Sequence, residues 1–419
     1  MRIQKNLDLK PAINRIVIGD VGSGKTIVAF LISLVYLQGL KSGMVAMLAP
    51  TEVLAFQHYQ KLLEYQKLWD DKFVNQVQFV FLTSKLIQLN GEKLTKKAFS
   101  QVDLKEKSVF WVGTQALLFN QDIQPEIVLV DEQHRFGVNQ RQQIAQNSHF
   151  ISFSATPIPR TLALTVYRSL QPHFLDTLQN RSPIATSLNI FENLYPELVN
   201  KIKVELSKNR KIYIICARVE DTEDDTDKPW SITKTTKFFE NYFPEQILSV
   251  HGKLAQKKDI LTEFKESETK NILIATTVVE VGVDVPEATL VIILNAERFG
   301  LSALHQIRGR VGRNEYLDNQ CILVTSKEFY RSKRLQYICR LQNGFEIAEK
   351  DLELRGSGDL IGTAQSGFGS EIDSLLGLNP ELYYQINNLV ENLEPSEIAE
   401  KLPRLQKYLI QESSKVWEE

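Results

Sequence analysis

The sequence has few cysteines and no long apolar run. Cys216, Cys321 and Cys339 are the three cysteines among 419 residues, and no two of them form a CxxC pair. An odd number at wide spacing argues against both a disulfide framework and a zinc site, so we expect a reducing, cytoplasmic location. The strongest apolar run, residues 27–37, is too short to cross a bilayer, and the N-terminus lacks the apolar core of a secretory signal. We therefore expect no membrane segment.

Glycine and proline are also scarce, and neither sign of charge dominates. The 20 glycines and 14 prolines are too few for a fibrous or broadly disordered protein. The 49 basic and 51 acidic residues give a net charge of −2, so any nucleic-acid binding must come from local clusters that this total conceals. At about 150 residues per domain, the length predicts two or three folded domains.

Short apolar runs rich in Val and Ile recur between longer amphipathic stretches in the first part of the chain. These predicted strands are residues 15–20, 44–50, 77–83, 108–114, 127–132 and 150–156. They are apolar throughout and do not alternate, as is typical of strands buried on both faces of a parallel sheet with helical crossovers. The pattern predicts a first α/β domain over residues 1–175.

The same rhythm restarts after a weakly patterned stretch over residues 171–196. The second set of predicted strands is residues 211–218, 246–252, 271–277, 290–296 and 319–325. We predict a second parallel α/β domain over residues 185–330, followed by a helical and Gly-rich region over residues 331–419. An acidic segment, residues 220–228, is interpreted as a solvated loop, with an acidic docking motif as the weaker alternative.

A phosphate-binding loop follows the first predicted strand. Residues 19–26 read GDVGSGKT, which matches GxxxxGK[ST] between an apolar strand and an apolar helical run. In such a loop the backbone wraps phosphate oxygens, Lys25 reaches the β and γ phosphates, and the Thr26 hydroxyl binds Mg²⁺. The alternative, a glycine-rich turn without a ligand, is weak in this context. The predicted nucleotide-binding residues of the loop are Gly19, Gly22, Ser23, Gly24, Lys25 and Thr26.

Two carboxylates, Asp131 and Glu132, follow the predicted strand IVLV. They are expected at the carboxyl edge of the sheet, the edge at which open α/β folds bind ligands and at which the phosphate loop also lies. There Asp131 would hold Mg²⁺ and Glu132 would orient and deprotonate the attacking water. An acidic pair after a strand is, in isolation, more often a helix N-cap, but the upstream phosphate loop favours the catalytic interpretation. His134 lies two residues after Glu132. By itself it could be an ordinary buried histidine, and only its place in the motif favours a functional role.

Taken together, these motifs resemble those of superfamily 2 helicases and translocases, and within them the RecG family of ATP-dependent DNA branch-migration enzymes. The matching blocks are GDVGSGKT (19–26), LAPTEVLAFQH (48–58), GTQALL (113–118), DEQHRFGV (131–138), SATPIPRT (154–161), ATTVVEVGVDVP (275–286) and HQIRGRVGR (305–313). A further block over residues 344–367 looks like the translocation motif that RecG shares with the transcription-repair coupling factor Mfd. So many ordered motifs make coincidence negligible.

The resemblance implies two tandem RecA-like parallel-sheet domains with a C-terminal helical hairpin and loop, and ATP with Mg²⁺ as cofactors. Carried over by position, Gln306, Arg310 and Arg313 match QxxGRxxR, with both arginines as fingers on the γ phosphate. A solvated basic face is the alternative, although Gly309 and Gly312 between these residues favour close packing. In the block over residues 275–286, Gly282 and Asp284, together with Glu280, would lie near the nucleotide.

Other matched positions are implied to contact DNA or to relay the nucleotide state. Residues that would face the nucleic-acid backbone are Thr51, Glu52, Thr114 and Gln115. Residues that would relay the nucleotide state are Ser154, Thr156 and Arg160. A polar network of the C-terminal hairpin would comprise Glu349, Asp351, Arg355 and Gln365, unless these residues only cap the hairpin. Branched or duplex DNA is thus the expected partner, recognised with little sequence specificity.

The family pattern also includes a strand-splitting wedge and an adenine-recognising element before the phosphate loop, and residues 1–15 match neither. From this we expect that ATP hydrolysis is possible and that unwinding is impaired, unless a separate chain supplies the wedge. The expected function is a RecG-like DNA translocase in recombination and replication-fork repair. The alternatives are an Mfd-like motor and a non-catalytic fragment that binds DNA or a partner. DEQH at residues 131–134 favours the RecG family over Mfd.

Overall fold

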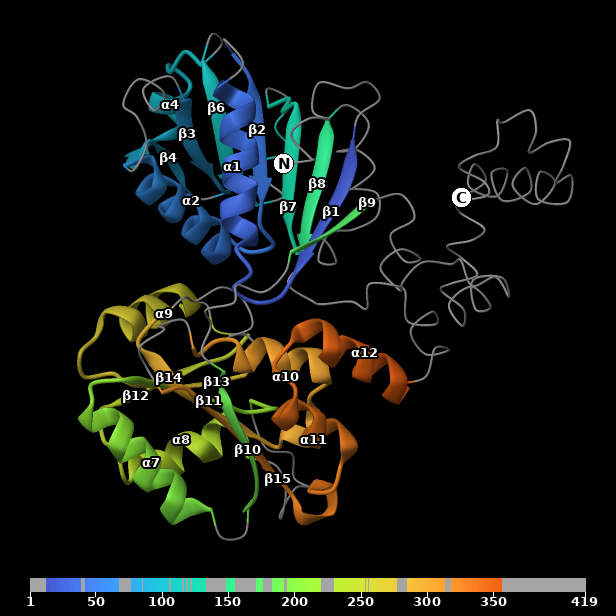
Figure 1. Ribbon diagram of the computed structural model, residues 1–419. Helices are drawn as coiled ribbons and strands as arrows, with labels where there is room; N and C mark the ends of the chain where they lie inside the picture. Colours follow the sequence, from blue (N-terminus) through green and yellow to red (C-terminus); the bar gives the residue numbers. More distant parts are fainter. Residues whose placement is uncertain are drawn as a thin grey trace, which may run out of the picture. The chain divides into compact units, whose positions relative to one another are not determined.

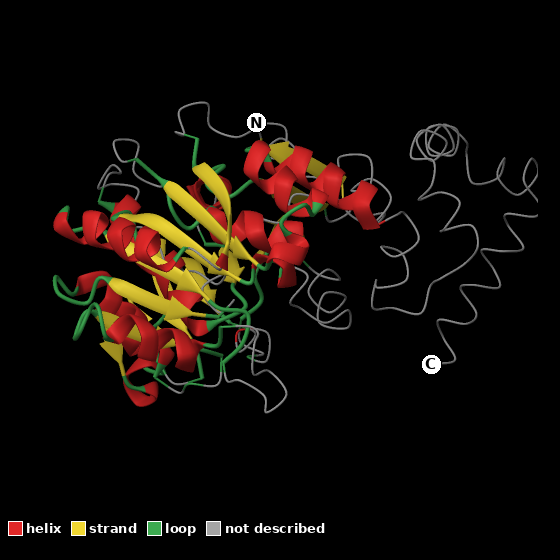
Figure 2. Cartoon of the chain, turned by 90° about the horizontal axis from the view of Figure 1, so that it is seen from below, coloured by secondary structure: helices red, strands yellow, loops and turns green. Residues whose placement is uncertain are grey.

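The structure is a computed structural model with two β-sheets flanked by helices (Figures 1 and 2). It describes residues 13–38, 42–67, 77–84, 86–104, 107–114, 117, 120, 123–132, 148–154, 171–175, 183–191, 194–219, 230–252, 254, 256–276, 285–312 and 318–355. Both sheets belong to one compact unit of the chain. The prediction of two parallel-sheet α/β domains is confirmed, while the exact domain boundaries stay predictions.

The first sheet has nine strands in the order β5-β4-β3-β6-β2-β7-β8-β1-β9. The strands are β1 Asn14–Gly19, β2 Met44–Leu48, β3 Val77–Leu82, β4 Ile87–Leu89, β5 Glu92–Leu94, β6 Ser108–Gly113, β7 Ile127–Asp131, β8 His149–Ser154 and β9 Gln171–Leu175. The β3–β4 and β4–β5 pairs are antiparallel. The remaining neighbours run parallel, which brings the carboxyl ends of β6, β2, β7, β8 and β1 to one edge.

The central strands of this sheet are buried because their side chains are apolar on both faces. Every residue of β6 is buried, as are the first four residues of β7. Helices α1 Lys25–Gln38 and α2 Glu52–Gln66 share one apolar cluster with the sheet and cover one of its faces (Figure 1). A short helix, α4 Lys96–Phe99, follows β5.

The second sheet has six strands, all parallel, in the order β10-β15-β14-β11-β13-β12. The strands are β10 Ala185–Ile190, β11 Lys211–Ile215, β12 Ile247–Val250, β13 Ile272–Ala275, β14 Ala288–Leu294 and β15 Gln320–Thr325. Helices α7 Tyr195–Ser207 and α8 Ile232–Glu240 pack on one face. The other face is covered by α9 Lys257–Glu266, α10 Leu301–Arg308 and α11 Lys333–Arg340, and by the first half of α12 Gly344–Arg355. Two short 3-10 helices are η6 Ala296–Arg298 and η7 Lys327–Phe329.

Four strands, β4, β5, β9 and β10, were not predicted. Each of them is short or lies at or near the edge of its sheet. The β4–β5 hairpin turns at Asn90 and Gly91, whose φ angles are 48° and 93°. An Asn-Gly pair is a strong signal for the two-residue turn of a hairpin, so the sequence did contain the information. Strands β9 and β10 lie in the stretch over residues 171–196 that the pattern left weakly defined. Both are edge strands with partly exposed side chains, and they therefore lack the continuous apolar pattern of buried strands.

The predicted helical hairpin corresponds in part to α11 and α12, which residues 341–343 connect. The loop predicted to follow it lies outside the described residues. Within the part of the chain that the structure describes, no helix combines the length and apolar character needed to cross a membrane. None of the three cysteines, all of which are among the described residues, forms a disulfide, and Cys216 and Cys321 are buried.

Candidate functional site

The carboxyl edge of the first sheet brings the predicted site residues together in a defined order. Following the strand order from β6 to β1, the residues at or just beyond the strand ends are Thr114, Thr51, Asp131, Ser154 and the phosphate loop. One strand, β8, separates Asp131 on β7 from the loop after β1, which corresponds to about 10 Å at the usual spacing of strands. The edge therefore has two halves. The half at β7, β8 and β1 carries the residues implied to bind nucleotide and is called the nucleotide half, and the half at β6 and β2 carries the residues implied to face DNA.

The phosphate loop turns tightly between β1 and α1. Gly22 and Gly24 adopt φ angles of 79° and 84°, a left-handed conformation that glycine reaches without steric cost. The Ser23 amide donates to the Asp20 carbonyl at 3.1 Å. The Lys25 ammonium donates to the carbonyl oxygens of Gly19 at 2.9 Å and Asp20 at 2.7 Å, so it lies against the loop itself.

Two observations favour a polar ligand at this loop. The Ser23 hydroxyl is buried and has no hydrogen-bond partner, although buried hydroxyls are normally paired. A Cβ at Gly19 would lie 2.3 Å from that same hydroxyl oxygen, so only glycine leaves room for it. The first turn of the 14-residue helix α1 adds backbone N–H groups that have no partner within the helix. A hydroxyl, an ammonium and helix N–H groups are donors suited to phosphate oxygens.

The two acidic residues at the end of β7 differ in their backbone geometry. Asp131 is the last residue of the strand, and its Oδ2 lies 2.8 Å from Nε2 of His58 on α2. Glu132 has a φ of 56°, in the left-handed region, and its amide donates to the Phe153 carbonyl at 2.9 Å. A non-glycine residue held there costs on the order of 1–3 kcal/mol, and such strain clusters at functional sites.

The donor set at this edge is compatible with Mg²⁺ bound together with phosphates. No group of three His, Cys, Asp or Glu side chains capable of holding a metal ion occurs among the described residues. Magnesium usually takes one or two protein oxygens and completes its shell with substrate phosphates and water. Thr26 and Asp131, which both lie at the carboxyl edge, supply oxygens of this kind.

The side chain of Asp20, within the phosphate loop, is buried and connects distant parts of the sequence. Its Oδ1 accepts from His305 Nε2 at 2.5 Å and from the Val21 amide at 2.6 Å, and its Oδ2 accepts from the Gly344 amide at 2.8 Å. Burial alone raises the pKa of the Asp20 carboxyl, but the interactions with His305 and the two amides outweigh it, so its pKa lies below the ordinary value. Asp20 is therefore ionised in the fold.

Arg308, on α10, extends this network. Its Nη2 lies 3.1 Å from Nδ1 of His305, and because arginine only donates, Nδ1 must accept and Nε2 carries the hydrogen that His305 donates to Asp20. Arg308 Nη1 donates to the carbonyls of Ile338 at 2.6 Å and Leu341 at 2.8 Å. Arg308 is 1% exposed. The network thus runs from the phosphate loop to the end of α11 and the start of α12.

Of the predicted QxxGRxxR residues, Gln306 lies on α10 and Arg310 just after its end, close to the phosphate loop. A Cβ at Gly309 would lie 2.9 Å from Cγ1 of Val21, so this glycine permits close approach, as expected from the sequence. Gly312, with a φ of 76°, is similarly packed against Ile184. Gln306 and Arg310 are both partly exposed, on either side of Gly309 in the sequence.

Among the residues implied to face DNA, Thr51 and Glu52 begin helix α2. Thr51 is the N-cap, and its hydroxyl accepts from the Leu54 amide at 3.3 Å. Glu52 Oε1 accepts from the Ser84 hydroxyl at 3.3 Å, which connects α2 to the loop after β3. Thr114 directly follows β6, and the carbonyl of its neighbour Gly113 accepts from the Ala49 amide at 2.9 Å.

Several predicted residues lie outside the described part of the chain. They are Gln115, His134, Thr156, Arg160, Glu280, Gly282, Asp284, Arg313 and Gln365. Of the predicted hairpin network, Glu349 and Asp351 lie on α12, which ends at Arg355. The neighbouring Lys350 lies 6.0 Å from the ring centroid of Tyr337 on α11.

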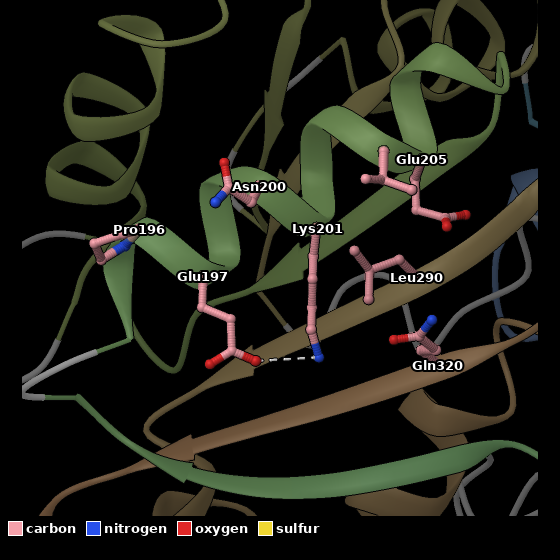
Figure 3. A pocket seen from close by; sticks show the side chains of 8 residues that line it. Pro196, Glu197, Asn200, Lys201, Glu205, Leu290 and Gln320 are labelled. Atoms are coloured by element: carbon pink, nitrogen blue, oxygen red, sulfur yellow. Dashed lines mark ion pairs between the residues drawn. The ribbon is translucent and has the colours of Figure 1, made fainter.

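A groove along α7 lies away from the carboxyl edge and contains none of the predicted residues (Figure 3). It has a volume of about 480 Å³ and is lined by α7 and by Leu290 and Gln320, near the amino ends of β14 and β15. Lys201 and Glu197 pair across one turn of α7 at 3.4 Å. An exposed pair of this kind contributes little to stability.

Sequence reasoning missed three side chains at the site, namely Asp20, His58 and His305. All three lie inside matched motifs, but a motif does not show which of its residues pair. Two partners of Asp20, His305 and Gly344, are 285 and 324 residues away, and His58 is 73 residues from Asp131. The sequence contains one signal for them: each is a charged or titratable residue next to apolar residues, and such a residue needs a partner when it is buried.

Comparison with known proteins connects most of the chain to helicases. Residues 4–165 match the DEAD/DEAH box helicase family, residues 193–315 match the helicase conserved C-terminal domain, and residues 341–374 match domain 3, C-terminal, of the ATP-dependent DNA helicase RecG. The ATP-dependent DNA helicase RecG of Aquifex aeolicus is 40% identical over 392 residues, covering 89% of this chain and 47% of the relative. RecG of Synechocystis is 41% identical over 377 residues, covering 87% and 43%. This chain spans about half the length of these relatives.

Solved structures give the same result. RecG bound to a three-way DNA junction has a TM-score of 0.67 and 28% identity, and the match covers 90% of this chain and 50% of that one. Yeast Dbp5 bound to RNA and ADP-BeF3 has a TM-score of 0.52 and 18% identity, covering 85% and 87%, and is similar in fold alone.

Proposed function

Because this chain belongs to the RecG-like superfamily 2 helicases, we propose that it is an ATP-dependent motor that moves on DNA. The observation that carries the proposal is the shared edge of the first sheet. A phosphate loop with donors suited to a polar ligand lies one strand away from an acidic pair, and the strands beyond are followed by threonines suited to a nucleic-acid backbone. ATP hydrolysis and DNA binding would thus use neighbouring parts of one edge.

In the proposed reaction, the loop amides and Lys25 bind the β and γ phosphates of ATP. Thr26 and Asp131 would hold Mg²⁺, which, when bound, neutralises negative charge on the phosphates. Glu132, whose backbone adopts a left-handed conformation at the end of β7, would accept a proton from the attacking water. Lys25 loses its two loop carbonyl partners when it turns to the phosphates, so ligand binding must replace those hydrogen bonds.

A second group of residues would stabilise charge that develops on the γ phosphate. We assign this role to Gln306, Arg310 and Arg313 by their match to QxxGRxxR, and a nucleotide-proximal role to Gly282 and Asp284 by the preceding motif. Two observations support the assignment for Arg310: its neighbour Gly309 packs against Val21 of the phosphate loop, and Asp20 in the same loop pairs with His305.

We propose branched or duplex DNA as the partner, contacted through its backbone by Thr51, Glu52, Thr114 and Gln115. The similarity to a RecG structure on a three-way junction supports this choice. A role in recombination and replication-fork repair follows from the same resemblance. The match of residues 341–374 to a RecG domain favours this family over the Mfd-like alternative. Weaker unwinding than translocation, and a separate chain that supplies a strand-splitting wedge, stay predictions.

The test is steady-state ATPase activity of the chain without DNA, with a forked DNA, and with linear duplex or single-stranded DNA. Lys25→Ala serves as the contamination control and should abolish hydrolysis, because it removes the ammonium that binds the phosphates. Strand separation of a labelled fork and displacement of a triplex-forming strand from duplex DNA should be measured in parallel, since they report unwinding and translocation separately. Equal hydrolysis by the wild type and Lys25→Ala would refute the proposal. Folded protein without hydrolysis would favour the non-catalytic alternative.

A further inference from the structure

His58 occupies a special position between the two halves of the carboxyl edge. It lies on α2, the helix that follows β2 and begins at Thr51, in the half that carries the residues proposed to face DNA. Its side chain reaches the end of the neighbouring strand β7, where Asp131 belongs to the nucleotide half. The hydrogen bond between His58 and Asp131 therefore joins the two halves of the carboxyl edge directly, from side chain to side chain.

The contact is short and protected from water. His58 Nε2 lies 2.8 Å from Asp131 Oδ2, and the side chains of His58 and Asp131 are 7% and 15% exposed. An ionised carboxylate has only acceptors, so Nε2 must carry the hydrogen and donate it. Helix α2 holds the imidazole in place, because its neighbours Ala55, Tyr59 and Leu62 are completely buried in the core of the first sheet.

This geometry determines which oxygen of Asp131 remains available. Oδ2 accepts from His58, so the carboxylate is held in one orientation and Oδ1 is left for a metal ion or its water. Hydrogen bonds from a second layer of residues commonly orient ligating carboxylates in this way, and their loss typically weakens metal binding by about 10- to 100-fold.

The same helix connects this carboxylate to the other half of the edge. Seven residues separate Thr51 at the start of α2 from His58, a distance of about 10 Å along a rigid helix. At that start, Thr51 caps the first turn and Glu52 accepts a hydrogen bond from Ser84. A backbone phosphate bound at these groups would shift or stiffen the helix that carries the donor to Asp131.

We propose that His58 is a positioning residue that orients Asp131 for Mg²⁺ and transmits DNA contact at the start of α2 to that carboxylate. This inference rests on the proposed function, because it assumes that Asp131 holds the metal ion of bound ATP. It assigns His58 no contact with nucleotide or DNA.

The test compares three variants of the full chain. His58→Leu removes the donor at similar volume, His58→Gln retains an N–H donor, and Tyr59→Phe is the matched control. Tyr59 lies on the same helix, is completely buried, and its hydroxyl contacts the Gly91 amide at 2.8 Å and the Phe79 carbonyl at 3.3 Å. Tyr59→Phe therefore removes a hydroxyl with two hydrogen bonds from α2 without touching Asp131.

The first measurement is Mn²⁺ binding in the presence of a non-hydrolysable ATP analogue, followed by electron paramagnetic resonance of the free ion. We expect His58→Leu to bind Mn²⁺ about 10- to 100-fold more weakly than the wild type, with His58→Gln in between and Tyr59→Phe unchanged. The second measurement is the ratio of ATPase rates with and without duplex DNA at saturating Mg²⁺. This ratio should fall in His58→Leu and stay at the wild-type value in Tyr59→Phe.

The outcomes separate the inference from the function on which it rests. If the wild type binds no Mn²⁺ with the analogue and hydrolyses no ATP, the proposed function fails and the inference with it. If the wild type binds Mn²⁺ and His58→Leu binds it equally well, His58 is merely structural and the inference is wrong. If His58→Leu binds Mn²⁺ more weakly but keeps the wild-type ratio of ATPase rates with and without duplex DNA, transmission through α2 is refuted. Urea midpoints of all variants show that each is folded.

Discussion

Replacing Asp20 tests whether the buried network at the phosphate loop stabilises the fold and shapes the nucleotide site. Asp20 is 3% exposed and accepts hydrogen bonds from His305, Gly344 and Val21. Asp20→Ala leaves two buried donors, His305 Nε2 and the Gly344 amide, without partners, and each orphaned donor costs about 1–3 kcal/mol. The free energy of unfolding should therefore fall by about 2–6 kcal/mol. Asp20→Asn keeps one acceptor oxygen and should lose about 1–3 kcal/mol.

The assay combines urea unfolding, followed by circular dichroism, with equilibrium binding of a fluorescent ATP analogue. Glu205→Gln is the matched control, because Glu205 is also buried and accepts from Thr289 at 2.5 Å and Arg210 at 3.1 Å, near the amino ends of the second sheet. Both acids should contribute to stability, but only the Asp20 variants should also bind the analogue more weakly. An unfolding midpoint of Asp20→Ala equal to that of the wild type, or equal losses of affinity in Asp20→Ala and Glu205→Gln, would refute the reasoning.

Three further predictions concern the same edge. Glu132→Gln should keep ATP binding but lower hydrolysis by about 10²- to 10⁴-fold, because it removes the proposed proton acceptor; analogue binding and phosphate release measure the two effects, and unchanged release would exclude this role. Gly309→Ala should destabilise the fold by about 1–3 kcal/mol, since its Cβ would lie 2.9 Å from Val21, and an unchanged urea midpoint would contradict that packing. The Asp20 carboxyl has a lowered pKa in the fold, so its contribution to stability is present above the ordinary value of 3.8 and is lost as the pH falls through the lower folded value. Urea midpoints measured at decreasing pH should therefore fall more steeply below about pH 4 for the wild type than for Asp20→Ala, and parallel curves would count against this assignment.

The sequence predicts the fold well where burial makes whole strands apolar. Strand β6 is buried along its entire length, and a continuous apolar run is what that environment requires. Strand β10 has exposed and half-buried residues, and its sequence ATSLNI carries polar side chains that conceal it. The β4–β5 hairpin could have been predicted from Asn90 and Gly91, since an Asn-Gly pair favours the tight turn that joins two antiparallel strands.

The candidate site is predictable to the extent that each role depends on local sequence. Lys25 follows β1 and Asp131 ends β7, and their positions at the carboxyl edge follow from parallel topology. The pairs Asp131–His58 and Asp20–His305 depend on which side chains meet after folding, and no local pattern encodes this. Arg308 illustrates the difficulty: it lies two residues before Arg310, yet it is buried and bonded to carbonyls of the α11 region.

The long separation between Asp20 and its partners has a consequence for the order in which the protein is built. His305 follows Asp20 by 285 residues, so at about 5–20 residues per second a ribosome adds it about 15–60 s later. The first sheet and its apolar cluster use residues from Ile13 to Leu175 alone and can form during this interval. A scaffold for the nucleotide site would then exist well before the phosphate loop acquires its last contacts, and synthesis itself would set when the site is complete.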